Sequence, residues 1–306
     1  MPSINNPSGA LPARFRRQRI LIVGCGDVGL RAAALLRGRA QLIALTSSPG
    51  RVPALRAAGL RPLVADLDAP QGLRRLAGIA TRVLHLAPPP SAEGARDPRT
   101  TALVRVLRLR SLPAALVYGS TSGVYGDCGG ARIDETRPVR PSTPRAHRRV
   151  DAERAVRWLG RAGVAVRLLR IPGIYAPDRV GGTPRERLRK GTPVLRSEDD
   201  VYTNHIHADD LARICVAALW RGGTQRSFHA SDDTELKMGD YIDLAADLYG
   251  VPRPSRVARD QAQAQLPPSL LSFMGESRRL DNGRMKRELR VRLRHATVAT
   301  GLRPGS

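Results

Sequence analysis

The first regular segment of the chain reads Ile20-Leu21-Ile22-Val23-Gly24-Cys25-Gly26-Asp27-Val28-Gly29, an apolar run followed by glycines spaced as G-x-G-x-x-G. This pattern predicts a β-strand, a tight turn and a helix in direct succession. Gly24 would allow the turn, Gly26 would let a pyrophosphate approach the backbone, and Gly29 would let the helix pack close to the strand. Asp27 and Val28 would begin the helix, whose N-terminus favours negative charge. The motif therefore predicts that this end of the strand binds a dinucleotide.

Short apolar runs and helical stretches alternate from this motif onward. The runs predict strands at 19–23, 41–46, 61–65, 82–86, 115–120 and 165–171. The stretches between them predict helices near 28–37, 52–58, 73–78, 100–110 and 145–161. Strands that alternate with helices form a parallel sheet covered on both faces, and right-handed crossovers make it doubly wound. The predicted fold is therefore an α/β fold of the Rossmann type.

The pattern changes after residue 172, where Gly, Pro and charged residues become frequent. We expect residues 1–18 to form a flexible tail, and 19–172 to form the Rossmann domain, continued by 201–230. Residues 173–200 and 231–306 would form a small mixed C-terminal lobe that binds substrate. After residue 172 we expect helices near 185–190, 209–221 and 238–249, and strands at 202–207 and 227–230.

The segment after the second strand bears on the choice of cofactor. A site for NAD usually has Asp or Glu there to bind the ribose hydroxyls, but this chain has hydroxyl side chains at Thr46 and Ser47 and a cation at Arg51. These groups suit a 2′-phosphate, so NADP is favoured and NAD stays possible. Arg51 could instead simply begin the next helix. The ends of the third and fourth strands should also contact the dinucleotide, through Asp66, Leu67, Leu86 and Ala87.

The net charge of +24 would suit a nucleic-acid partner, because each phosphate contact releases counterions. The arginines, however, are scattered through almost every segment, and aromatic residues that could stack on bases make up only 4% of the chain. A nucleic-acid partner is therefore disfavoured, and a small-molecule substrate is expected.

The composition also bears on location. No apolar run reaches the ~18 residues that span a bilayer, and the N-terminal residues lack the apolar stretch of a secretory signal. The three cysteines are widely spaced and suggest free thiols. We expect a cytoplasmic protein without a membrane partner; the sequence leaves its oligomeric state open.

Further motifs follow the glycine loop in a recognisable order. They are Ser120-Thr121-Ser122-Gly123-Val124-Tyr125-Gly126, Glu153, Ile171-Pro172-Gly173-Ile174-Tyr175 and Asn204-His205-Ile206-His207-Ala208-Asp209-Asp210. With them the chain resembles the extended short-chain dehydrogenases/reductases, in particular the YeeZ-like branch of the NAD-dependent epimerase/dehydratase group. The resemblance covers about residues 19–302. It implies the Rossmann fold and a nicotinamide cofactor, and says nothing about the substrate.

Members of this superfamily pair a Ser or Thr after the fifth strand with Tyr-x-x-x-Lys on the next helix. Thr121 matches the first position, but the Tyr and Lys positions, counted back from Glu153, are held by Arg145 and Arg149. Arginine cannot shuttle a proton at neutral pH, because its pKa lies above ~12. The resemblance implies an oxidoreductase or epimerase in which Thr121 orients a small polar substrate. Arg145 and Arg149 would then act as anion clamps: Arg149 could hold the ribose or a phosphate, and Arg145 could bind an anionic group of the substrate or simply be solvated.

Two rival functions stay open. The first is a non-catalytic sensor of NADP(H), which the missing Tyr and Lys favour. The second, less favoured, is nucleic-acid binding.

Two clusters could carry other chemistry. His205, His207, Asp209 and Asp210 would suit a metal ion, but a third convincing ligand is missing, so no metal is expected. Asp134-Glu135 offers carboxylates in a loop, where we expect them to be solvated. Ser122-Gly123 stands where the dehydratases of the family carry Asp-Glu, which disfavours dehydration of a sugar nucleotide.

Overall fold

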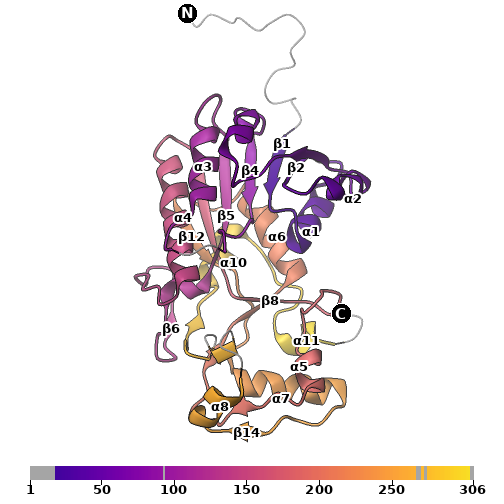
Figure 1. The fold of residues 1–306 in the computed structure, drawn as a ribbon, viewed down its shortest axis with the longest axis vertical. Helices are drawn as coiled ribbons and strands as arrows, with labels where there is room; N and C mark the ends of the chain where they lie inside the picture. The colour runs from indigo at the N-terminus through magenta and orange to yellow at the C-terminus, as the bar shows by residue number, and fades with distance from the viewer. Residues whose placement is uncertain (1–17, 92–93, 267–269, 272–273, 304–306) are drawn as a thin grey trace, which may run out of the picture.

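The computed structural model describes residues 18–91, 94–266, 270–271 and 274–303, so the predicted tail, apart from Gln18, lies outside the described residues. Seven parallel strands form the main sheet in the order β12-β7-β5-β4-β1-β2-β3 (Figure 1). The strands are β1 (Arg19–Val23), β2 (Gln41–Thr46), β3 (Arg61–Val64), β4 (Arg82–His85), β5 (Ala115–Thr121), β7 (Ala165–Ile171) and β12 (Arg226–His229). The order reverses between β1 and β4, and in sheets of this kind ligands bind beside the carboxyl ends of the strands at that point.

Alternate residues of β1 show how the sheet is covered. Ile20 and Ile22 lie in a core shared with α1 (Asp27–Leu36) and α6 (Ala208–Ala218). Leu21 and Val23 point to the other face and lie in a core shared with helices α3 (Pro98–Leu107) and α4 (Pro144–Gly160). The strands β1, β2, β4, β5 and β7 are buried over most of their length, so their sequences are mostly continuous apolar runs instead of alternating ones, whereas the edge strand β3 is only partly buried. The predicted doubly wound sheet is confirmed.

The helices of the second face begin at recognisable caps. Asp97 and Thr143 accept hydrogen bonds from the backbone N–H groups of Thr100 and Ala146, and a proline follows each cap. These caps start α3 (Pro98–Leu107) and α4 (Pro144–Gly160). The helices expected at 100–110 and 145–161 therefore begin two residues and one residue earlier, at the prolines that follow these caps.

Two predicted elements differ in the structure. The helix expected at 73–78 is the 3₁₀ helix η3 (Pro70–Leu76), whereas α2 (Val52–Ala57) forms as expected. The strand expected at 202–207 is divided into β10 (Tyr202–Thr203) and β11 (His205–His207). The strand is interrupted at Asn204. The side chain of this residue donates a hydrogen bond to the carbonyl oxygen of Arg278 and accepts one from the backbone N–H of Leu280.

A smaller lobe lies below the main sheet in Figure 1. Its helices are α5 (Arg185–Arg189), α7 (Met238–Tyr249), α8 (Arg259–Gln265) and α11 (Val298–Gly301). Its strands pair in twos: β9 (Val194–Leu195) with β14 (Arg256–Val257), and β10 with β13 (Leu236–Lys237). Outside this lobe, β11 pairs with β8 (Gly173–Tyr175), and β6 (Arg132–Ile133) with β15 (Arg279–Leu280). The helix α10 (Gly283–Leu289), which the sequence pattern assigned to the smaller lobe, buries Met285 and Leu289 in the core shared with α1 and α6.

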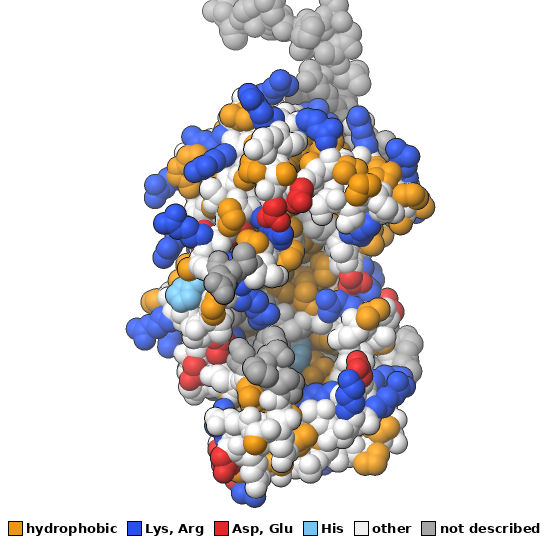
Figure 2. Space-filling view, in the orientation of Figure 1, with side chains coloured by type: hydrophobic (Ala, Val, Ile, Leu, Met, Phe, Trp, Pro, Cys, Tyr) orange, Lys and Arg blue, Asp and Glu red, His pale blue; other side chains and the backbone are white. Residues whose placement is uncertain are grey.

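Many arginines of this basic chain have structural partners. Arg167 and Arg82 donate to carbonyl oxygens of Ala218 and Leu219 at the C-terminal end of α6, and Arg157 donates to the carbonyl of Gln225. Cations bind such free carbonyls well. Figure 2 shows Lys and Arg side chains spread over both lobes on this face of the molecule. In the described part of the chain, no helix is both long and apolar enough to cross a membrane.

Candidate active site

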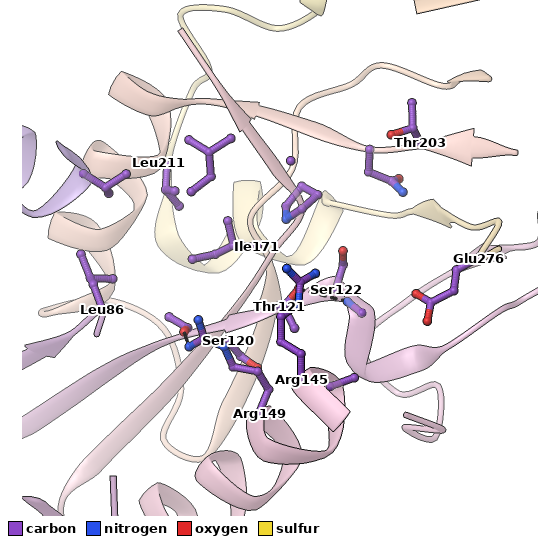
Figure 3. Close-up of a pocket in the computed structure, with 18 of the residues that line it drawn as sticks. Leu86, Ser120, Thr121, Ser122, Arg145, Arg149, Ile171, Thr203, Leu211 and Glu276 are labelled. Carbon is purple, nitrogen blue, oxygen red and sulfur yellow. Dashed lines mark hydrogen bonds between the residues drawn. The ribbon is translucent and has the colours of Figure 1, made fainter. Parts of the chain in front are cut away.

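A cavity of about 1030 Å³ opens at the carboxyl edge of the main sheet, between the two lobes. Its wall is built by the glycine loop, the end of β5, the start of α4 and segments of the smaller lobe. Leu86, Ile171 and Leu211 line one side, whereas Ser122, Thr203 and Glu276 line the other (Figure 3). One end of the cavity is therefore apolar and adjoins the glycine loop, and the other end is polar.

Each glycine of the loop has its own steric reason. Gly24 has a φ of +87°, and a Cβ built on it would lie 2.3 Å from the backbone nitrogen of Ala87. A Cβ on Gly29 would lie 2.9 Å from the carbonyl oxygen of Gly24. Gly26 differs, because a Cβ there would meet no protein atom within 4 Å. Packing of the chain explains the first two glycines, whereas the open space at Gly26, which lines the cavity, leaves room for a group from outside the chain.

The predicted cofactor residues fall into two groups. The first group lines the cavity and comprises Gly24, Gly26, Asp27, Val28, Gly29 and Leu86. The second group lies outside the lining and comprises Thr46, Ser47, Arg51, Asp66, Leu67 and Ala87. Ala87 packs behind Gly24. Arg51 still reaches the loop, because its Nη2 donates to the carbonyl oxygen of Cys25 at 2.7 Å.

Thr121 ends β5 and lines the cavity. Its Oγ1 accepts a hydrogen bond from the backbone N–H of Gly123 at 3.2 Å, which caps the turn η4 (Ser122–Tyr125). The hydroxyl hydrogen stays available to donate, since the cap uses only a lone pair. Behind it, Ser120 donates to buried Glu153 at 2.6 Å, and Glu153 pairs with Arg170 at 2.9 Å. This buried network fixes the strand end that presents Thr121.

Arg145 and Arg149 both come from the first two turns of α4 and line the cavity beside Thr121 (Figure 3). Nη1 of Arg149 donates to the carbonyl oxygen of Gly119 at 2.7 Å and to the hydroxyl of Tyr118 at 3.1 Å. Burial, and then the charge of Arg149, lower the pKa of Arg145. An arginine keeps its charge even so, and therefore two neighbouring cations make this part of the cavity favourable for an anion.

The sequence pattern missed Glu276, which comes from the far end of the chain. Glu276 lines the cavity, and a Cβ on Gly123 would lie 4.0 Å from its Oε2. Its carboxylate accepts hydrogen bonds from Ser142 at 2.5 Å and from both Nη atoms of Arg278 at 2.8 Å. It thus lies across the turn where the family's dehydratases carry Asp-Glu. No local motif marks this glutamate, so only the fold could reveal it.

Tyr202 and Asn204 also line the cavity, as does Arg179. Asn204 belongs to a motif quoted above, but Tyr202 and Arg179 carry no signal in the sequence. Glu135, expected to be solvated, is instead buried, and its Oε1 accepts from the backbone N–H of His229 at 3.0 Å. It lies outside the lining of the cavity, so its role is structural.

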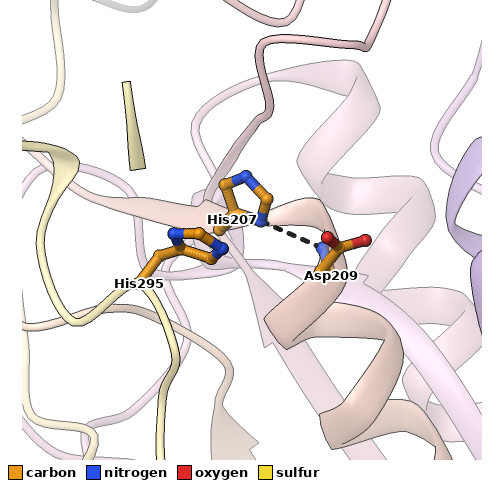
Figure 4. Close-up of side chains that lie close together, drawn as sticks. All are labelled: His207, Asp209 and His295. Carbon is orange, nitrogen blue, oxygen red and sulfur yellow. Dashed lines mark hydrogen bonds between the residues drawn. The ribbon is translucent and has the colours of Figure 1, made fainter. Parts of the chain in front are cut away.

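The predicted histidine cluster divides in the structure. His205 stacks on Tyr241 at 4.1 Å between ring centroids, whereas His207 stacks on His295 at 3.8 Å and lies beside Asp209 (Figure 4). His295 is the third residue that sequence spacing could not supply. Nδ1 of His207 already accepts from the backbone N–H of Asp209 at 3.2 Å, and Asp209 pairs with Arg31 at 2.6 Å. A metal ion bound through Nδ1 of His207 and Oδ1 of Asp209 would displace both interactions, and we still expect none.

Burial of neutral histidines predicts a pH-dependent stability. Burial lowers the pKa of His85 and of His205 to about 3, and that of His229 to about 4. The unfolded chain binds these protons from pH ~6.5 downward, so the free energy of unfolding should fall between pH 6.5 and 5 by about 1.4 kcal/mol per pH unit for each net proton. Burial raises the pKa of Asp232 to about 7, so the folded protein binds a proton there that the unfolded chain does not bind in this pH range. This reduces by one the net number of protons taken up on unfolding.

Urea unfolding at several pH values measures this slope. His205→Phe keeps the ring beside Tyr241 and should reduce the slope by one proton. Equal stability at pH 6.5 and pH 5 would contradict the prediction.

Comparison with known proteins identifies the family. Residues 20–230 match the model of the NAD dependent epimerase/dehydratase family. The chain belongs to this family. The resemblance found from its motifs is thereby confirmed, and the cavity at the carboxyl edge of the sheet lies in the matched part and the lobe beside it. No curated protein matches the chain.

Solved structures agree with this family. A conserved protein of unknown function from Silicibacter pomeroyi is similar, with a TM-score of 0.77, 29% identity, and coverage of 93% of this chain and 96% of that chain. UDP-glucose 4-epimerase from Thermotoga maritima superposes with a TM-score of 0.76, 18% identity and the same coverage. A dTDP-glucose 4,6-dehydratase from Streptomyces venezuelae, with NAD bound, has a TM-score of 0.74, 22% identity and coverage of 93% and 95%. The last two show the fold alone.

Proposed function

We propose that this protein binds a nicotinamide dinucleotide, NADP in preference to NAD, and acts as an oxidoreductase or epimerase on a small anionic substrate. The open space above Gly26, at the start of α1, is the observation that carries the proposal. A helix N-terminus that directly follows an open glycine loop is suited to binding a pyrophosphate, because its backbone N–H groups and its dipole favour negative charge. The similar dehydratase and a UDP-glucuronic acid 4-epimerase from Bacillus cereus have structures with NAD.

The substrate would lie at the polar end of the cavity. The dinucleotide would supply hydride transfer at its nicotinamide ring, and the chain would orient the substrate through the hydroxyl of Thr121. Arg145 and Arg149 would hold a phosphate or carboxylate, because charge-assisted contacts to planar guanidinium groups are strong. Tyr202 and Glu276 are the proton-carrying groups of this end of the lining that could replace the missing tyrosine.

We expect NADP to bind about ten- to a hundredfold more tightly than NAD. One charge-assisted contact to the 2′-phosphate is worth ~1.5–3 kcal/mol, and Arg51 is held beside the glycine loop by its bond to Cys25. Arg51→Ala should therefore weaken NADP binding and leave NAD binding almost unchanged. Isothermal titration calorimetry with both dinucleotides measures this directly. If neither binds the wild-type protein, the proposed function fails; if NAD binds as tightly, only the preference fails.

A second function is favoured by the same site. Both members of the Tyr-x-x-x-Lys pair are replaced, and Nη1 of Arg149 is bonded to the strand backbone, as suits a protein that binds the dinucleotide without turning a substrate over. Such a sensor of NADP(H) would show tight dinucleotide binding with no turnover in any substrate screen. A turnover-competent substrate would decide against it.

A further inference from the structure

Two acid–base pairs face each other beside the glycine loop. One pair, Asp27 and Arg31, lies on the first turns of α1, and the other, Asp178 and Arg179, lies on the loop that follows β8. Each arginine binds the acid of the other pair: Arg31 Nη2 lies 2.7 Å from Asp178, and Arg179 Nε lies 3.4 Å from Asp27. The loop after β8 is thereby attached to the start of α1.

The Arg31 contact is the anchor of this arrangement. Arg31 also binds Asp209 at 2.6 Å and Asp27 at 3.2 Å. Burial opposes its charge, but the hydrogen bonds to Asp178 and Asp209 outweigh that cost and raise its pKa. The loop is also closed on itself, because Ala176 and Gly182 are joined by a backbone hydrogen bond of 3.2 Å. Arg179 is therefore presented from a fixed position.

The Arg179 contact is looser than the anchor. Nη1 of Arg179 donates to the carbonyl oxygen of Ile174 at 2.9 Å, which orients the guanidinium. Oδ2 of Asp27, although buried, has no hydrogen bond in the described part of the chain, so Arg179 holds it by charge alone. Arg179 lines the same cavity as Gly24, Gly26 and Asp27. A carboxylate at this helix start repels a second anion unless a cation lies between them.

We propose that Arg179 binds the pyrophosphate of the dinucleotide, and that it gives up its ion pair with Asp27 for that contact. This inference rests on the proposed function, because it takes the ligand of the glycine loop to be a dinucleotide. Arg179 lies outside the main sheet, on the loop after β8. This loop therefore completes a pyrophosphate site of which the glycine motif forms the first part. Asp27 then acts as a competitor for Arg179 when the dinucleotide is absent.

The two partners should have opposite effects on binding. Arg179→Gln should weaken NADP binding about tenfold or more, because a charge-assisted contact is lost. Asp27→Asn should tighten it several-fold, because the competitor and a like charge near the phosphates are removed. Arg179→Lys keeps the charge without the planar fork and should fall between Arg179→Gln and the wild type.

Calorimetric titration of the full chain with NADP tests this, and melting curves show that each variant is folded. Arg253→Gln is the matched control: it removes the same charge and breaks an ion pair, of 2.6 Å with Asp247, that lies outside the cavity lining. It should bind like the wild type. If Arg179→Gln binds NADP as the wild type does, or if Asp27→Asn weakens binding as much as Arg179→Gln, the pair is structural and the inference is wrong. Wild-type protein that binds no dinucleotide would instead overturn the proposed function.

Discussion

Gly26→Val is expected to abolish dinucleotide binding in a protein that remains folded. Gly26 has an extended backbone with a φ of −80° and a ψ of −157°, and an added Cβ would meet no protein atom within 4 Å. Valine at this position should therefore leave the fold intact. It should prevent binding of the pyrophosphate, because the added side chain would occupy the space that the pyrophosphate needs. We expect a loss of more than about a hundredfold in affinity for NADP, measured by calorimetry, and a melting temperature near that of the wild type.

Two other glycines make this test specific. Gly72→Val should leave both folding and binding intact, because a Cβ there makes only an ordinary contact of 3.9 Å with Ala65. Gly24→Ala should instead damage the fold itself, because it places a side chain at a positive φ and against the backbone of Ala87. If NADP still stabilises the Gly26→Val protein against heat, the dinucleotide lies elsewhere.

Neutral alcohols and neutral sugars are expected to show little or no hydride transfer with the wild-type protein. Arg145 stands at the position of the family's catalytic tyrosine and cannot shuttle a proton. The two cations of α4 also favour anionic groups beside Thr121. A screen of alcohols, aldehydes and sugar nucleotides, followed by nicotinamide absorbance, measures this. Rapid turnover of a neutral alcohol that survives both Arg145→Ala and Thr121→Ala would show that other residues carry the chemistry.

The same reasoning predicts a change in anion binding. Arg145→Ala should weaken binding of small phosphates and carboxylates to the NADP-bound protein about ten- to a hundredfold, and should leave NADP binding nearly intact. Arg149→Ala should also weaken NADP binding, because Arg149 stands where the family carries the lysine that holds the nicotinamide ribose, and its guanidinium is fixed against the end of β5. Arg154→Ala is the control, since it removes the same charge from the same helix outside the cavity lining. If Arg145→Ala and Arg154→Ala lose equal affinity for these anions, the effect comes from the net charge of the protein and not from a contact with Arg145.

The sequence by itself determined the sheet and the glycine loop, because both depend on signals that are local. Most strands of the main sheet are runs of buried, mainly apolar residues, and the caps of α3 and α4 are formed by residues close to them in sequence. The three glycines could be assigned from their spacing, since a strand, a turn and a helix follow one another within ten residues. The replacement of Tyr and Lys by Arg145 and Arg149 was also visible in the sequence, because both positions can be counted back from Glu153. Residues four apart share one face of a helix, so the two arginines were expected to lie together.

Only the tertiary structure decided which distant residues complete the cavity. Glu276 lies about half the chain from Thr121 in sequence, yet its carboxylate covers the turn after β5. His295 reaches His207, and Arg179 reaches Asp27, through loops whose course depends on how the smaller lobe docks on the sheet. The division of the strand at Asn204 has the same origin, because its side chain bonds to residues more than seventy positions later. No pattern of neighbouring residues encodes such contacts, because the chain brings them together only when the lobes pack.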